Sequence, residues 1–485
     1  MDFITAMTET RTQNGVKAYQ STKSDLVDAF ASLGSKREAT ENEILRMYGN
    51  AWAENSELTL KLAFYIRNVR GQGLGERKIF RTILKYLAQK EPKLIVANLH
   101  NIAHYGRYDD LFELLDTSVE KEMLAYIKST IEQDLKSDDE VTLLGKWLPS
   151  LNTSSKLTRI KAGKIRRFLE IDSKQYRKIL STLRIKIDVV EKKMSSNQWK
   201  EINYEAVPSR AMMIYRKAFE RHDEGFTIYV EKVENGEAKV NSGTLYPYDL
   251  MEKMYLRIGS YDSMLRNPES ILVEQWKALP NFIEGENNIL VMADTSGSMD
   301  GRPIMTSVGL ALFFAERNKG IFKDVFMTFS DNPEFIQLKG QTLPEKVRNI
   351  KSIVANTNLD KAFEKILMAC ANNELPQEQV PKALVVISDM QFDLMTSHND
   401  KTVYEKYVDK FAEYGYTIPN IIYWNVNSST DVFQTFSDVK GVQMYAGQSV
   451  SVFKAIINNI GKTPYQAMED VLNSEEFDRI ITRAD

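Results

Sequence analysis

Asp294, Ser296 and Ser298 are the residues whose types and spacing point most directly to chemistry in this chain. They lie in ADTSGSM (293–299), directly after an apolar run, so one carboxylate and two hydroxyls converge from a single turn. Gly297 lets that turn bend tightly. Such oxygen ligands suit a hard divalent cation, and magnesium takes them at about 2.1 Å. An isolated Asp-x-Ser-x-Ser also fits an ordinary helix-capping turn, so the surrounding elements must decide.

The elements that would position this turn alternate between strand and helix from residue 289 onward. Apolar runs, most of them followed by a turn and an amphipathic helical pattern, occur in NILVMAD, DVFMTFS, KALVVISD, NIIYWNVN and GVQMYAG. This alternation predicts an α/β domain with a mainly parallel sheet that is covered by helices on both faces. Ligands bind such sheets beyond the carboxyl ends of the strands, which is where Asp294 is expected.

The motif resembles the metal-ion-dependent adhesion site of von Willebrand factor A-type domains. The resemblance implies two further ligands from later loops, and Thr357 in ANTNLDKAF and Asp389 in KALVVISD match them. It also implies a bound Mg²⁺, or another divalent cation such as Mn²⁺, and an acidic residue of a partner protein at the open coordination position. A hydrolase would need a base to activate bound water. We expect that the protein is not an enzyme, because the sequence gives no indication that a histidine reaches this loop to act as that base. The four histidines are His100, His104, His222 and His398.

Residues 1–270 are expected to be mostly helical. Apolar residues recur every three or four positions in NEILRMYGNAWAEN, ELTLKLAFYIRNVR, RKIFRTILKYLAQK and PKLIVANLHNIAHYG. Helices of this length separated by short breaks resemble HEAT-like paired repeats that could form a ring, although no fixed period is present. The polar, proline-containing stretch 268–288 predicts the passage into a second domain at 286–485.

One segment departs from the helical pattern. Between residues 223 and 246 polar and more apolar positions alternate, and Asn235-Gly236 supplies the residues of a tight turn. This pattern predicts a β-hairpin inserted among the helices.

Charge is distributed unevenly along the 485 residues. The whole chain carries a net charge of -3, but residues 145–221 contain 19 Lys or Arg against 7 Asp or Glu, which gives +12 there and -15 elsewhere. Such a segment attracts polyanions. No run approaches the roughly 20 apolar residues of a membrane span, so no membrane association is expected. The single cysteine, Cys370, and an N-terminus without signal-peptide features predict a cytoplasmic protein.

Several longer strings resemble a family of proteins known as "domain of unknown function 2828". They are RNVRGQGLGER (67–77), HYGRYDDL (104–111), KWLPSLNTSSK (146–156), YRKILSTLR (176–184), VPSRAMMIYRKAFERHD (207–223) and SDMQF (388–392). That family joins a helical region to a von Willebrand A-like domain. The architecture is similar to the TROVE module of Ro ribonucleoproteins, whose ring of helical repeats binds RNA. RNA binding is therefore what the resemblance implies by analogy.

Ten basic side chains are the candidate RNA contacts. Four surround the glycine-rich RNVRGQGLGERK, which follows a helical pattern and lacks the Gly-Lys-Ser/Thr ending of a nucleotide loop. Six fall within about three helical turns, a density that can neutralise several phosphates. The ten are Arg67, Arg70, Arg77, Lys78, Lys156, Arg159, Lys161, Lys164, Arg166 and Arg167. The alternatives are a magnesium-dependent scaffold that recruits proteins without RNA, a metal-dependent hydrolase, or a merely solvated helix face.

Overall fold

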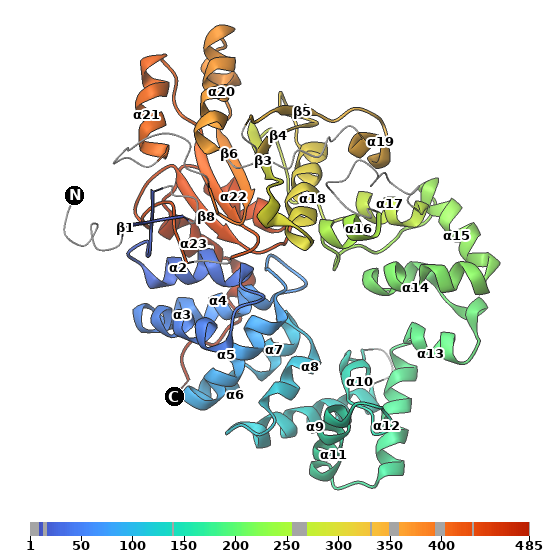
Figure 1. The fold of residues 1–485 in the computed structure, drawn as a ribbon. Helices are drawn as coiled ribbons and strands as arrows, with labels where there is room; N and C mark the ends of the chain where they lie inside the picture. The colour runs from blue at the N-terminus through green and yellow to red at the C-terminus, as the bar shows by residue number, and fades with distance from the viewer. Residues whose placement is uncertain are drawn as a thin grey trace.

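The protein has a mixed α/β fold, with helices in its N-terminal half and a sheet in its C-terminal half, as predicted (Figure 1). In the computed structural model the described residues are 9–12, 17–137, 140–254, 269–329, 332–348, 358–392, 403–428 and 431–484. Among them, no helix has both the length and the apolar character that crossing a membrane demands.

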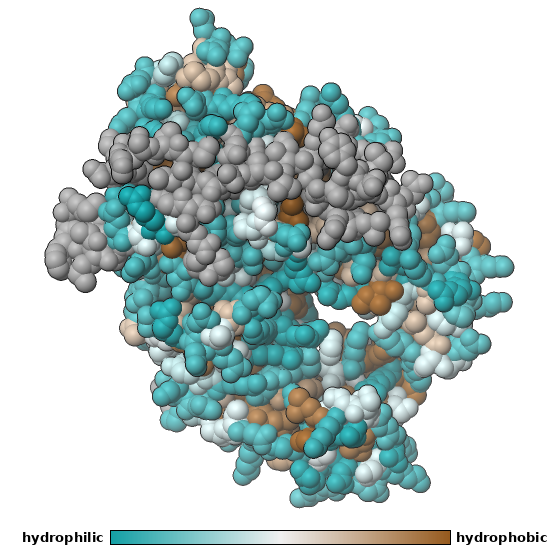
Figure 2. All heavy atoms as spheres, viewed as in Figure 1, coloured by the Kyte–Doolittle hydropathy of each residue, from teal (hydrophilic) through white to brown (hydrophobic). Residues whose placement is uncertain are grey.

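The helices of the N-terminal half follow one another in an arc (Figure 1). Polar residues cap many of them, and Thr40 forms a reciprocal capping box with Glu43 at the start of α3. The space-filling view shows an opening at the centre of the molecule that this arc borders (Figure 2). The helices are α2 (Asp25–Ser32), α3 (Glu41–Glu54), α4 (Ser56–Arg67), α5 (Arg77–Lys90), α6 (Pro92–Ala97), α7 (Leu99–Tyr105), α8 (Tyr108–Leu111), α9 (Glu120–Lys136), α10 (Leu144–Trp147), α11 (Lys156–Phe168), α12 (Ser173–Lys186), α13 (Val190–Ser195), α14 (Ser209–His222), α15 (Glu224–Glu234), α16 (Pro247–Met254) and α17 (Ser270–Lys277).

The predicted hairpin at 223–246 is wrong, because residues 224–234 form helix α15 and no part of the segment is a strand. Phe226, Tyr229 and Val233 are buried, and their spacing of three and four residues places them on one helical face. The turn pair Asn235-Gly236 ends the helix instead of joining two strands, with Gly236 at φ +75°. The short alternating pattern therefore did not determine the structure; burial of one helical face did.

The C-terminal half contains a six-stranded sheet in the order β5-β4-β3-β6-β7-β8, in which only the edge strand β5 is antiparallel to its neighbour. All residues of β3 and β6 are buried, as expected for central strands covered by helices. The strands are β3 (Ile289–Asp294), β4 (Val325–Phe329), β5 (Phe335–Gln337), β6 (Ala383–Ser388), β7 (Asn420–Asn425) and β8 (Val442–Ala446); the helices are α18 (Arg302–Arg317), α19 (Leu343–Arg348), α20 (Leu359–Asn372), α21 (Val403–Glu413), α22 (Val452–Asn459) and α23 (Pro464–Leu472).

The two halves are interlocked at both ends of the chain. The short strands β1 (Glu9–Arg11) and β2 (Lys17–Tyr19) pair with each other, and the backbones of Tyr19 and Phe433 exchange two hydrogen bonds of 2.8 Å. Helix α2 packs against β8, and α16 packs against α18. At the other end, the Tyr105 hydroxyl donates to the Glu476 carbonyl oxygen at 2.6 Å. The larger of two hydrophobic clusters among the described residues therefore runs through both halves, while a second, separate cluster lies around α14 and α15.

Asp28 in the interlocking helix α2 makes stability depend on pH. Burial raises the pKa of this carboxyl from 3.8 to about 6, although Thr22 donates its N–H to Oδ1 at 2.8 Å. The folded state therefore holds more protons than the unfolded state between about pH 4 and 6, so stability falls as pH rises through that window. We expect the Asp28 contribution to be about 3 kcal/mol. Chemical denaturation at a series of pH values should show this loss in the wild type and a flatter profile in Asp28→Asn.

Candidate functional site

Asp294 ends β3 at the carboxyl edge of the sheet, and its side chain is fully buried. Oδ1 accepts a hydrogen bond from the Ser296 N–H at 2.8 Å, and Oδ2 accepts one from the Ser388 hydroxyl at 2.5 Å. Burial raises the pKa of Asp294 to about 6; these hydrogen bonds oppose the shift, and the negative charge of Asp389 adds to it. The carboxylate is thus held in one orientation at an energetic cost.

Asp389 reaches the same edge because β6 is the parallel neighbour of β3, with Ala293 opposite Ile387. It is 3% exposed, and Oδ1 accepts from the Gln391 N–H at 3.1 Å. Burial raises the pKa of Asp389, while a hydrogen bond with the Ser298 side chain opposes that shift.

The hydroxyls of the Asp294 turn complete a set of oxygen atoms. The Ser296 and Ser298 hydroxyl oxygens lie 3.1 Å apart, and Ser298 is exposed. Thr357 lies outside the described residues, so its predicted contribution has no structural counterpart here.

This donor set fits a hard divalent cation. Two buried carboxylates that repel each other are stabilised by a positive charge between them, and hydroxyl oxygens are suitable further ligands. Among the described residues no group of three or more His, Cys, Asp or Glu could hold a metal ion, so the site at Asp294 depends on its serines. Ser388, the last residue of β6, was not predicted as part of the site, because only the fold directs its hydroxyl toward Asp294.

The described histidines lie in the helical half. His100 and His104 belong to α7, and His222 stacks on Trp199 with ring centroids 4.5 Å apart. His398 lies outside the described residues.

Arg67, predicted to contact RNA, is instead a structural residue. It is 1% exposed, and its Nε donates to Asp110 Oδ2 at 2.8 Å, while Asp110 itself is fully buried. The sequence alone does not show which arginine or lysine of a basic segment forms a buried ion pair. A buried arginine in an ion pair cannot reach a phosphate on the surface.

Removal of Arg67 should therefore affect folding. We expect Arg67→Ala to destabilise the protein by about 3 kcal/mol, because it leaves Asp110 buried with fewer partners. The exposed neighbour Arg70 provides the control, and Arg70→Ala should change stability by less than about 0.5 kcal/mol. Equal stability of the two variants in urea denaturation would refute the structural role of Arg67.

The other basic residues of the glycine-rich segment are exposed. Lys78 donates to the carbonyl oxygens of Arg37 and Ala39, and Arg77 is exposed at the start of α5. Burial, with Arg81 and Arg107 nearby, lowers the pKa of Arg77. Both side chains therefore lie on the surface.

Arg70 lines a cavity of about 370 Å³ together with His100, His104 and Arg479. Its Nη1 donates to the His104 carbonyl oxygen at 3.2 Å, and Arg479 Nη1 lies 2.8 Å from His104 Nδ1. The cavity is therefore cationic. Arg479 was missed because it comes from the far end of the chain, where no sequence signal links it to α7.

Acidic neighbours neutralise part of the predicted basic helix α11. Lys161 Nζ lies 3.0 Å from Glu113, and Lys164 forms ion pairs with Asp116 and Glu120. These two lysines can reach a phosphate only if those ion pairs break. The charge count along the sequence did not reveal this, because the acidic residues precede the basic segment.

Three other basic residues of α11, Lys156, Arg159 and Arg167, are exposed. Lys156 and Arg167 are exposed eleven residues apart, which is about three turns, so they lie on one side of the helix. The salt bridges found among the described residues involve neither of them. Arg159 and Arg166 donate to backbone carbonyl oxygens, which are neutral acceptors. Ile160, between them, is 47% exposed.

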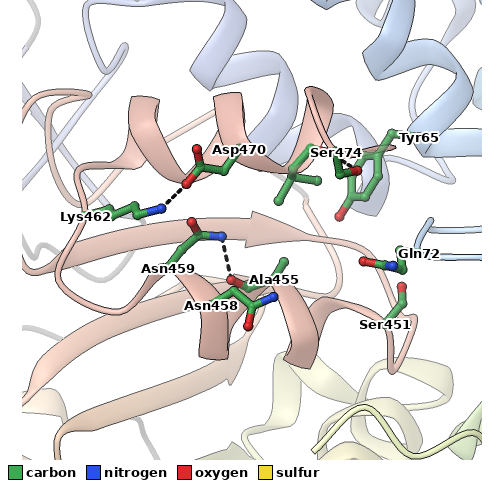
Figure 3. Close-up of a pocket in the computed structure, with 10 residues that line it drawn as sticks. Tyr65, Gln72, Ser451, Ala455, Asn458, Asn459, Lys462, Asp470 and Ser474 are labelled. Atoms are coloured by element: carbon green, nitrogen blue, oxygen red, sulfur yellow. Dashed lines mark hydrogen bonds and ion pairs between the residues drawn. The ribbon is translucent and has the colours of Figure 1, made fainter. Parts of the chain in front are cut away.

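A smaller cavity of about 160 Å³ lies between the two halves (Figure 3). Tyr65 and Gln72 line it from the helical half, while Asn459, Lys462 and Asp470 line it from the C-terminal half. Lys462 is ion-paired with Asp470, so the lining carries no excess charge. It suits water or a small neutral polar molecule better than an anion.

Two family models match this chain. The one described as Domain of unknown function (DUF2828) matches residues 12–134 and 124–286, more than half of the chain, and the one described as Domain of unknown function (DUF7788) matches residues 288–482. An uncharacterised protein, L728, of Acanthamoeba polyphaga mimivirus is 26% identical over 506 residues, which cover 95% of this chain and 86% of that protein. The two matched regions meet just before β3.

Proposed function

We propose that this chain, which belongs to the DUF2828 family, is a non-enzymatic, cytoplasmic RNA-binding protein similar in architecture to Ro ribonucleoproteins. Its HEAT-like helical half holds single-stranded or structured RNA on a basic surface. Its C-terminal half is a von Willebrand A-type domain that binds Mg²⁺ and recruits a protein partner.

The observation that carries the RNA proposal is the outward face of α11. Lys156 and Arg167 project from it without carboxylate partners among the described residues, and Arg159, which donates to neutral carbonyl oxygens, is exposed in the same helix. Surface cations in this arrangement form few stabilising interactions within the protein. When they bind RNA phosphates, the counterions condensed on the RNA are released, which favours binding. The exposed Ile160 supplies apolar contact within the same face.

The sheet supports the assignment of the C-terminal half. It is parallel except for one edge strand, and Asp294 and Asp389 meet at its carboxyl edge with Ser296 and Ser298. These residues would hold the cation, which would supply an open coordination position for an acidic side chain of a partner. Ser388 would orient the Asp294 carboxylate.

Crosslinking in cells that express the protein, followed by its purification, tests the RNA proposal. RNA should be recovered with it. The second candidate is a magnesium-dependent scaffold without RNA, which the pairing of Lys161 and Lys164 with acidic residues favours. In that case a protein partner would be recovered in the presence of Mg²⁺, and RNA would be absent.

A further inference from the structure

A second basic site lies away from the predicted residues, in a cavity of about 590 Å³. It is formed by the loop after α10 together with α12 and α13, which lie in the lower right of Figure 1. Four cationic side chains line it: Lys146, Arg177, Arg184 and Lys192. All four belong to the basic segment 145–221, but none was singled out from the sequence.

Arg184 is the fixed element of this cavity. Its Nε donates to the Gly145 carbonyl oxygen at 3.1 Å, Nη1 to Ser150 Oγ at 3.2 Å, and Nη2 to the Leu148 carbonyl oxygen at 2.9 Å. All three acceptors are neutral, and burial lowers the pKa of this guanidinium. Its planar fork is held in position while its charge has no carboxylate partner among the described residues. An anion would compensate that charge.

The rest of the lining carries more positive than negative charge. Arg177 and Lys192 are exposed at the cavity. Glu191 is the carboxylate found among the described lining residues, and its Oε1 is near the Tyr215 hydroxyl, at 3.5 Å. Four cations thus face one carboxylate.

The cavity also has apolar walls. Leu151, Leu180 and Val189 line it beside the cationic groups. An inorganic phosphate or a single acidic side chain would satisfy the guanidinium but leave these walls in contact with water. A nucleotide carries a phosphate and a flat, largely apolar base in one unit, so it matches both parts of the lining.

We propose that this cavity holds one nucleotide of a single-stranded RNA, with its phosphate near Arg184 and Arg177 and its base against Leu151 and Leu180. The inference rests on the proposed RNA-binding function and specifies where the strand is held. A duplex keeps its bases stacked inside, so it cannot place one in such a cavity.

The test measures the affinity of a fluorescein-labelled oligouridylate by anisotropy at several salt concentrations. Arg177→Glu/Lys192→Glu reverses two exposed charges, and Lys90→Glu/Lys128→Glu is the matched control on α5 and α9. We expect the cavity variant to lose on the order of 30-fold in affinity, with a salt slope smaller by about 2, while the control changes little. The affinity for an RNA duplex should be equal in the wild type and the cavity variant.

Three results would overturn the inference while leaving RNA binding intact: unchanged affinity of the cavity variant, an equal loss in the control, or competition by free uridine monophosphate as effective as by the oligonucleotide. Absence of RNA binding by the wild type would overturn the proposed function itself. A 4-thiouridine crosslink gives a readout without mutation, and it should attach to the peptides that contain Leu151 or Leu180. Crosslinks confined to other peptides would contradict the proposal.

Discussion

Lys156→Glu/Arg167→Glu is expected to weaken the binding of single-stranded RNA on the order of 30-fold at about 0.15 M salt. Each lost phosphate contact should lower the slope of log affinity against log salt by about 1, so the slope should fall by about 2. Both side chains are exposed on one face of α11, so their replacement should leave the fold intact. Filter binding or anisotropy over a salt series measures both quantities.

A variant of two ion-paired lysines in the same helix provides the control. Lys161 and Lys164 are bound to Glu113, Asp116 and Glu120, so Lys161→Gln/Lys164→Gln should change RNA affinity much less. Equal losses in the two variants would mean that the helix responds only to its total charge. An unchanged affinity after charge reversal at Lys156 and Arg167 would remove α11 from the RNA surface.

Asp294→Ala is expected to abolish Mg²⁺ binding, with a loss of affinity greater than about 100-fold, because it removes a carboxylate that would contact the cation directly. In the wild type, Mg²⁺ should raise the melting temperature, since a ligand that binds only the folded state stabilises it. Calorimetric titration and thermal melting with and without Mg²⁺ measure the two effects.

Two further variants separate metal binding from folding. Asp294→Asn keeps an oxygen that can accept from Ser388 or the Ser296 N–H, so it should fold normally but bind Mg²⁺ weakly. Asp300→Asn changes an exposed carboxylate on the same loop and should bind Mg²⁺ like the wild type. If Mg²⁺ does not change the melting temperature of the wild type, the proposed metal site is contradicted.

Local pattern was enough to predict the elements that carry the candidate metal site. Apolar runs such as KALVVISD form parallel strands, and their shared edge brings Asp389 beside Asp294 without any contact being known in advance. The helices of the N-terminal half likewise follow from apolar spacing. The hairpin prediction at α15 was wrong because a short alternating pattern does not show which side chains will be buried. Phe226, Tyr229 and Val233 are buried together on one face of a helix.

Pairing between distant segments was beyond prediction. Arg67 looked like a surface cation until Asp110 was found beside it, and Lys161 looked available until the fold brought Glu113 to it. The role of Arg184 could not be predicted either, because it depends on three neutral acceptors that hold the guanidinium at a cavity. Counting charges along a chain locates a basic region, but the partners decide which charges remain available.

The most direct test of the central claim is ultraviolet crosslinking in cells that express the protein, with identification of both the RNA and the attached peptides. We predict that RNA is recovered and that its crosslinks fall within the basic segment 145–221, on α11 and around the cavity lined by Arg184. Recovery of no RNA above the level of a non-binding control protein, or crosslinks confined to the C-terminal half, would contradict it.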